Sequence, residues 1–369
     1  MKVLFVFGTR PEGIKMAPII KEIQKRNKFE CYTCVTGQHR EMLDQVLEIF
    51  DIEPDYDLNI FKKGQSLTDV TTKTLEGLEN ILDELKPDIL LVQGDTTTVF
   101  AAALAAFYKK IKIGHVEAGL RSGNLYSPYP EEANRKLTGV ISHYHFAPTE
   151  SNRQNLIEEG YDEKNIFITG NTVIDALKYS VREDFVFDDE ILNDLDYNKD
   201  VVLLTAHRRE NWGKPMEDIF KAIRRVVLER ENLEIVFPRH LNPIVRDAAE
   251  KYFADLDRVH LIEPLSYLPF SNLMARVKFV VTDSGGVQEE APALGKPVLV
   301  LRNETERMEG VEAKTAKLVG TKEQDVYESI VSLLDDKDLY DEMAKAVNPY
   351  GDGHAAEKIV DVLEEMIWF

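Results

Sequence analysis

Three carboxylates in this sequence have the residue type and the placement for acid–base chemistry. Asp95 and Glu117 each come shortly after an apolar run, and Glu131 opens a helical stretch. Taken singly, each has a structural interpretation: Asp95 suits a helix N-cap, and Glu131 suits the first turn of a helix. Taken together, crowded and buried carboxyl groups can have pKa values raised toward neutral, which is what proton transfer at pH 7 requires.

A different chemistry is predicted by residues 278–301, KFVVTDSGGVQEEAPALGKPVLVL. An apolar run ends at Asp283, and a Ser-Gly-Gly turn leads into a helical stretch. The free N–H groups of such a helix N-terminus bind an anion such as phosphate. Glu289 and Glu290 lie about a turn further on, where they could meet neutral hydroxyls such as those of a ribose. The pattern therefore indicates a nucleotide site, with an ordinary strand–turn–helix unit as the alternative.

Cationic side chains follow two other apolar runs. Arg10 and Lys15 lie in GTRPEGIK near the N-terminus, and His207 and Arg208 lie in HRREN. These residues could neutralise a phosphate or pyrophosphate through charge-assisted hydrogen bonds, or they could be surface cations without a ligand. The first loop lacks the three glycines of a GxGxxG loop, so NAD binding is not indicated.

The elements that must position these residues are short apolar strands that alternate with amphipathic helical stretches, in two sets. This pattern predicts an α/β protein with two doubly wound parallel sheets. Ligands of such sheets bind outside the carboxyl ends of the strands, so we expect the chemistry at a cleft between two domains. The predicted strands are 3–7, 30–35, 89–92, 112–115, 144–147 and 166–168 in the first set, and 201–205, 234–237, 259–262, 279–282, 298–301 and 316–319 in the second.

The same pattern predicts the domain boundaries. Residues 1–180 form the first Rossmann-like domain, and residues 195–354 form the second. The acid-rich segment 182–200 has no clear strand period and is interpreted as the linker. A final amphipathic stretch, residues 355–369, is expected to pack back onto the first domain.

Composition limits the partners. The 369-residue chain has 45 Lys and Arg residues against 65 Asp and Glu residues, a formal net charge of −20. A field of this sign argues against nucleic acid and anionic membranes, whereas a small phosphorylated ligand needs only a local group of cations. No apolar run approaches the roughly 20 residues of a membrane helix. The N-terminus, MKVLFVFGTR, is interpreted as a strand rather than a signal peptide, so we expect a cytoplasmic location.

No metal site is predicted. Cys31 and Cys34 form a CxxC pattern inside a strand-like run, where side chains three residues apart face opposite ways. His143 and His145 would share one face of a strand, but no third ligand lies near them in sequence. DxD triplets fall in polar loops and are interpreted as chance in so acidic a chain.

A set of motifs spread over nearly the whole chain resembles the non-hydrolysing UDP-N-acetylglucosamine 2-epimerases. In the family's order, these motifs are GTRPEGIKMAP, QHREMLDQVL, GDTTT, GHVEAGLRSG, SPYPEEANRKLTG, TGNTVIDAL, HRREN, DSGGVQEEAPALGKPVLV, TER and NPYGDGHA. The resemblance implies a GT-B-type fold of two Rossmann-like domains. It also implies interconversion of UDP-GlcNAc and UDP-ManNAc with no cofactor, by elimination of UDP to 2-acetamidoglucal and re-addition.

The resemblance carries over to individual positions. It implies catalytic roles for Asp95, Glu117, Glu131 and His207. It also implies substrate-binding roles for Arg10, Lys15, Phe270, Ser284, Gly285, Gly286, Glu290 and Arg307. His207 and Arg208 are added to the substrate-binding set because their charge suits a pyrophosphate. A homodimer is implied as well. Within this scheme we expect Asp95 and Glu131 to handle protons at C2 and Glu117 to tune them.

Bacterial relatives also use a second substrate molecule as an activator. The resemblance places that pocket at Gln38, His39 and Arg40 and at a histidine like His240. Glu41 and Gly64 stand where some of those relatives carry Gln and Arg, which leaves activation open in this chain. Three rival functions also stay open: a GT-B glycosyltransferase, a hydrolysing epimerase that releases free ManNAc, and a silent nucleotide-sugar sensor.

Overall fold

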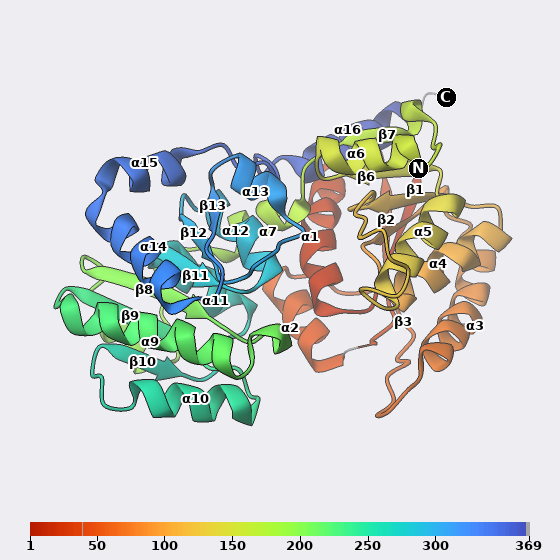
Figure 1. The fold of residues 1–369 in the computed structure, drawn as a ribbon. Helices are drawn as coiled ribbons and strands as arrows, with labels where there is room; N and C mark the ends of the chain where they lie inside the picture. The colour runs from red at the N-terminus through yellow and green to blue at the C-terminus, as the bar shows by residue number, and fades with distance from the viewer. Residues whose placement is uncertain (39, 367–369) are drawn as a thin grey trace. The chain divides into compact units, whose positions relative to one another are not determined.

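The computed structural model describes residues 1–38 and 40–366, and the chain forms two compact units (Figure 1). Unit 1 comprises Met1–Lys178 and Gly351–Phe369, and unit 2 comprises Tyr179–Tyr350. Each unit contains one parallel sheet with connecting helices. Among the described residues, none of the helices combines the length and the apolar character needed to span a membrane.

The sheet of unit 1 has seven parallel strands in the order β3-β2-β1-β4-β5-β6-β7. The strands are β1 (Lys2–Phe7), β2 (Glu30–Val35), β3 (Tyr56–Asp57), β4 (Ile89–Gln93), β5 (Lys112–Val116), β6 (Tyr144–Ala147) and β7 (Ile166–Ile168). The α-helices are α1 (Arg10–Lys25), α2 (Arg40–Ile49), α3 (Leu67–Leu85), α4 (Thr97–Tyr108), α5 (Glu131–Ile141), α6 (Glu150–Glu158), α7 (Thr172–Ser180) and α16 (Ala355–Glu365). The edge strand β3 was not predicted, because two residues are too short to show an apolar alternation.

The sheet of unit 2 has six parallel strands in the order β10-β9-β8-β11-β12-β13. The strands are β8 (Asp200–Thr205), β9 (Leu233–Pro238), β10 (Val259–Ile262), β11 (Phe279–Thr282), β12 (Val298–Val300) and β13 (Ala316–Leu318). The α-helices are α8 (Glu190–Asp194), α9 (Lys214–Glu229), α10 (Pro243–Phe253), α11 (Tyr267–Arg276), α12 (Gly285–Ala293), α13 (Met308–Glu312), α14 (Glu323–Asp335) and α15 (Lys337–Lys345).

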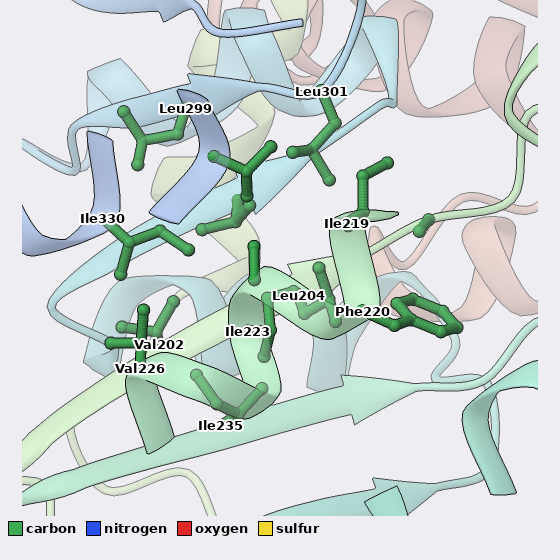
Figure 2. Packing of buried hydrophobic residues seen from close by; sticks show 14 of the residues in the cluster. Val202, Leu204, Ile219, Phe220, Ile223, Val226, Ile235, Leu299, Leu301 and Ile330 are labelled. Carbon is green, nitrogen blue, oxygen red and sulfur yellow. The ribbon is translucent and has the colours of Figure 1, made fainter. Parts of the chain in front are cut away.

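The strands of unit 2 are apolar on both faces, as expected for a parallel sheet covered on both sides. Val202 and Leu204 of β8 point into one core cluster, and Val201 and Leu203 point into another. Figure 2 shows the first cluster, in which α9 packs its apolar stripe against the sheet. Side chains three and four residues apart on α9 make that stripe, since they share one helix face. The labelled members of the stripe are Ile219, Phe220, Ile223 and Val226.

Both sheets reverse their strand order beside their first strand. β1 lies between β2 and β4, and β8 lies between β9 and β11. The connections that leave the two neighbouring strand ends therefore run to opposite faces of the sheet, which opens space at the carboxyl edge. In unit 1 the flanking loops carry Arg10 and Asp95. In unit 2 they carry His207 and the Ser284–Gly286 turn.

The acid-rich segment 182–200 belongs to unit 2 rather than lying between the units. Its Phe187 and Leu192 are buried in the core of unit 2, and Asn193 bonds the backbone of Phe187 in both directions. The linker interpretation is therefore corrected. The apolar side chains of this segment follow no strand period among its many acids, yet they are enough to attach it to the core of unit 2.

The C-terminal helix α16 packs on α1 of unit 1. Arg26 donates to Asp361 at 2.6 Å and Lys28 to Glu364 at 2.8 Å, although these pairs are partly exposed and stabilise little. At the other end of α16, the buried carboxylate of Asp175 accepts the backbone N–H of Ala356 at 2.9 Å. Residues 367–369 of the predicted stretch lie outside the described part of the chain.

Candidate active site

Glu117 lies at the end of β5 and gathers polar groups from three separate segments of unit 1. Its Oε1 accepts from Lys15 Nζ at 2.5 Å and from Asn171 Nδ2 at 3.2 Å, and its Oε2 accepts from Gln93. The backbone of Glu117 has φ of 64°, a conformation that costs a non-glycine residue free energy and that clusters at functional sites. The carboxylate is thus held in one place. Lys15 pairs with this acid here, and its predicted contact with a phosphate stays a prediction.

Asp95 lies in the loop after β4, and its structural interpretation as an N-cap is wrong. Thr96 is the N-cap of α4, and its side chain accepts the N–H of Val99. Asp95 instead pairs with Arg135, whose Nη2 and Nε lie 2.6 and 2.8 Å from Oδ2, while Asn134 donates to the Asp95 carbonyl at 2.9 Å. The Asp95 carboxylate therefore faces a cation rather than the helix N-terminus, and its catalytic role stays a prediction.

Glu131 is the first residue of α5, and its neighbour Glu132 carries the structural role in that turn. The fully buried Glu132 carboxylate accepts the N–H groups of Ser122 at 3.0 Å and Gly123 at 3.2 Å, so it anchors the loop before the helix. Glu131 is only partly buried. Of the two adjacent acids, the structure therefore leaves Glu131 as the candidate for chemistry.

The loop between β1 and α1 is built around a buried acid that sequence reasoning missed. The carboxylate of Glu12 accepts the N–H of Gly8 at 2.7 Å and of Thr9 at 3.4 Å. Burial raises the pKa of Glu12 to about 7, against the smaller lowering effect of its hydrogen bonds. A Cβ on Gly8 would lie 2.0 Å from Thr36 Oγ1, so glycine is required there. Arg10 follows as the first residue of α1.

In unit 2, a buried acid organises the loop after β8. Asp283, at the end of β11, is fully buried and accepts the backbone N–H groups of His207 at 2.8 Å and Arg208 at 2.9 Å. Asn211 donates to the same oxygen at 3.1 Å. The imidazole of His207 stacks on that of His240, with ring centroids 5.8 Å apart and an interplanar angle of 18°. The structure thus places the predicted catalytic histidine against a histidine predicted to serve an activator pocket.

The Ser-Gly-Gly turn forms the N-terminus of α12, with Ser284 at the N-cap. A Cβ on Gly285 would lie 2.6 Å from Nη1 of Arg307, so the guanidinium rests directly against this backbone. Glu289 holds Arg307 in place, with Nε and Oε1 2.7 Å apart. The expectation that Glu289 meets a ribose hydroxyl is therefore corrected. Glu290 bends back over Gly286, where a Cβ would lie 3.5 Å from Oε1.

Three arginines converge near this turn. Glu306 contacts Arg307 directly, Arg302 at 2.8 Å and Arg208 at 3.7 Å. Burial alone would raise the pKa of Glu306, but Arg307 and Arg302 outweigh it and lower the pKa to about 2. The cations are thus preassembled around one carboxylate. Helix N–H groups and clustered guanidinium groups together are what a pyrophosphate requires.

The remaining predicted positions are less closely connected to these groups. Phe270 of α11 packs against an apolar cluster of unit 2. Gln38 accepts from Thr98 Oγ1 at 2.7 Å, and Arg40 pairs with Asp44 and Asp57. His39 lies outside the described residues.

Within the described ranges, no three His, Cys, Asp or Glu side chains lie close enough to hold a metal ion. Cys31 and Cys34 are free thiols, and burial raises the pKa of each to about 12, so both stay protonated. His145 packs its ring against Tyr161, with centroids 4.7 Å apart, and burial lowers its pKa to about 3. These patterns therefore have structural explanations.

Four important partners were not singled out from the sequence. Arg135 had a spacing signal, because it lies one helical turn after Glu131 on the same face of α5. Gln93 and Asp283 had a weaker signal as polar residues at strand ends. Asn171 belongs to the TGNTVIDAL motif, but its contact with Glu117 had no spacing signal, since the two residues are 54 positions apart.

Comparison with known proteins decides the family. A family model described as UDP-N-acetylglucosamine 2-epimerase matches residues 21–364. The UDP-N-acetylglucosamine 2-epimerase of Bacillus subtilis (strain 168) is 56% identical over 363 residues, covering 98% of this chain and 95% of the relative. The chain belongs to the UDP-N-acetylglucosamine 2-epimerase family. The family predicted from the motifs is confirmed.

Solved structures of family members are similar along the whole chain. The crystal structure of a Listeria monocytogenes protein that has been assigned as a UDP-N-acetylglucosamine 2-epimerase is similar to this chain, with a TM-score of 0.94 at 50% identity. The similarity covers 99% of this chain and 96% of the Listeria chain. The Neisseria meningitidis UDP-GlcNAc 2-epimerase, solved bound to UDP-GlcNAc, has a TM-score of 0.87 at 51% identity, with 99% and 100% covered. The predicted fold class, two Rossmann-like α/β units of the GT-B type, is confirmed.

Proposed function

We propose that this protein interconverts UDP-GlcNAc and UDP-ManNAc as a non-hydrolysing epimerase. The observation that carries the proposal is the family match over residues 21–364. The geometry supports it, because the loops that flank the reversal of strand order carry Asp95 in unit 1 and His207 and the Ser284–Gly286 turn in unit 2. A fold of this type serves several chemistries, so the side chains rather than the architecture support the assignment.

The chemistry begins with a hydrogen that is not acidic. The C2 proton of the sugar has no neighbouring carbonyl, so direct abstraction would be too slow. In the proposed route, the C1–O bond breaks and its electron pair leaves with UDP, while the C2 proton passes to a carboxylate. A C1=C2 double bond forms, giving 2-acetamidoglucal. UDP then adds back to C1, and a proton arrives at the opposite face of C2.

Unit 2 is proposed to stabilise the departing pyrophosphate. The N–H groups at Ser284–Gly286 and the guanidinium of Arg307 at Gly285 form one anion-binding group. His207 and Arg208 are held beside it by Asp283. Removing one donor that stabilises developing negative charge typically costs about 10²–10³ in rate.

Unit 1 is proposed to move the protons. Asp95, beside Arg135, and the partly buried Glu131 are the candidates for taking and giving the C2 proton. Glu117 is tied to Lys15, Gln93 and Asn171, so it suits a fixed charge near the reacting centre better than a mobile proton carrier.

Heavy water provides the test. Incubating the protein with UDP-GlcNAc in heavy water and recording proton NMR spectra should show UDP-ManNAc that carries deuterium at C2. A hydrolysing epimerase would release free ManNAc, whereas a glycosyltransferase or a sensor would leave the sugar unchanged. Inverted sugar that keeps its original hydrogen, or a requirement for NAD, would contradict the mechanism.

We also propose that the protein is a homodimer through α4 and α5. These helices pack together in unit 1 and expose large apolar side chains, Phe107, Tyr108, Leu137 and Val140. Such a group on an otherwise charged chain marks an interaction surface. In analytical ultracentrifugation, Val140→Lys should shift the protein to monomer, whereas Leu228→Lys on α9 of unit 2 should not. A dimer that survives Val140→Lys would place the interface elsewhere.

A further inference from the structure

The carboxylate of Asp283 makes unequal use of its two oxygens. Oδ2 accepts three hydrogen bonds, from the backbone of His207 and Arg208 and from the side chain of Asn211. Oδ1 is equally buried and makes no hydrogen bond of good geometry to any described residue. An unsatisfied buried carboxylate oxygen is costly, so a donor is expected near it. The imidazole Nδ1 of His207 lies 3.3 Å away.

A second contact limits how the His207 ring can turn. His240 stacks on one face of the ring, while Asp283 meets it at the Nδ1 edge. The side chain of His207 remains 39% exposed even though that of Asp283 has no exposure. The ring is therefore held at one edge and one face, and part of it stays accessible.

We propose that Asp283 is a positioning residue that accepts the Nδ1–H of His207 and so leaves Nε2 as the working nitrogen. This inference rests on the proposed role of His207 at the departing pyrophosphate. When the ring is protonated, Nε2–H donates a hydrogen bond to the leaving phosphate oxygen, and Asp283 stabilises the imidazolium from behind. When UDP adds back to C1, the same hydrogen bond is released, so no net proton is consumed.

The competing explanation is that Asp283 only anchors the loop after β8. Asp283→Asn separates the two explanations. Its carbonyl oxygen can still accept the N–H groups of His207 and Arg208, so the loop keeps its backbone anchor. Its NH₂ group would face Nδ1, which can then only accept, and the proton of the neutral ring moves to Nε2. The neutral ring of the variant still has an Nε2–H, but the carboxylate that stabilises the imidazolium is gone, so the positive charge offered to the departing phosphate is lost.

The experiment combines NMR with kinetics on the full-length protein. In protein labelled with ¹⁵N-histidine, the signal of His207 is assigned by its absence from the His207→Gln variant. In the unmodified protein, the neutral ring of His207 should carry its proton on Nδ1. Asp283→Asn should carry it on Nε2, with kcat lowered about 10²–10³-fold through lost stabilisation of the departing charge, and KM for UDP-GlcNAc changed only a few-fold. Asn211→Ala is the matched control. It loosens the same anchor, yet should leave the tautomer of His207 unchanged.

Two results would overturn the inference. One is a neutral His207 ring with its proton on Nε2 in the unmodified protein. The other is an Asp283→Asn protein whose kcat is within about threefold of normal. The first measurement does not depend on the Asp283→Asn variant, so a failure of that variant to fold does not leave the question open. If unmodified protein shows the Nδ1 proton but does not epimerise UDP-GlcNAc, the proposed function fails while the Asp283–His207 contact stands.

Discussion

Unit 1 and unit 2 share the same strand order around their first strands, β2-β1-β4 and β9-β8-β11, but fill the space beside them differently. Unit 1 places carboxylates there and surrounds them with donors, as Lys15, Gln93 and Asn171 surround Glu117. Unit 2 places a helix N-terminus there and gathers arginines around it. The strand order therefore determines where a site can form, and the loop side chains determine whether that site carries negative or positive groups.

The largest expected effect tests the acid side of this contrast. Glu117→Gln keeps the shape of the side chain but removes the charge that pairs with Lys15. Deuterium uptake at C2 should fall by about 10²–10³, the scale of losing one fixed charge near the reacting centre, while the Kd for UDP, measured by calorimetry, should change only a few-fold. Glu76→Gln, at an exposed position of α3, is the control and should be fully active. A fully active Glu117→Gln protein would refute the role of this acid.

The next effect tests the anion side, with two adjacent glycines as a matched pair. A Cβ at Gly285 would lie 2.6 Å from Arg307, whereas a Cβ at Gly286 would make an ordinary 3.5 Å contact with Glu290. Gly285→Ala should therefore displace the guanidinium and weaken UDP binding by about 10–100-fold, the scale of one or two charge-assisted hydrogen bonds. Gly286→Ala should weaken it less. If calorimetry shows equal losses of UDP affinity in the two variants, the contact between Arg307 and Gly285 does not contribute to UDP binding.

The smallest effect concerns the stability of the fold. It distinguishes the buried acid Glu12 of unit 1 from the acids of unit 1 that form ion pairs. The pKa of Glu12 is about 7 in the folded protein, above its ordinary value of 4.5. Between these values the folded state holds a proton that the unfolded state has lost, so the free energy of unfolding falls as pH rises from about 4.5 to 7. The full loss is at most about 3 kcal/mol.

Urea denaturation at several pH values checks this expectation. Glu12→Gln cannot ionise, so its stability relative to the unmodified protein should increase across this window and stay constant above it. A difference that does not vary with pH would show that Glu12 is ionised in the folded protein. The accompanying activity profile would show whether the loop carrying Arg10 depends on the same proton.

Local sequence patterns predicted most of the strands, because a buried parallel strand needs a continuous apolar run wherever it occurs. They also placed Asp95, Glu117 and His207 at strand ends. They could not show which side chains meet there. Glu289 was assigned to a ribose because of its helical position, but its partner Arg307 comes from a loop beyond β12. Likewise, an N-cap was the structural alternative considered for Asp95, but the adjacent Thr96 caps the helix.

The return of α16 to unit 1 affects how the chain can be made. Unit 2 is one continuous stretch, Tyr179–Tyr350, whereas unit 1 needs residues from both ends of the sequence. During synthesis, unit 2 is therefore complete while unit 1 still lacks its last helix, whose Ile359, Val360 and Leu363 are buried. Residues 1–178 alone would leave the apolar surface of α1 uncovered. Unit 1 is therefore completed only after all of unit 2 has been synthesised.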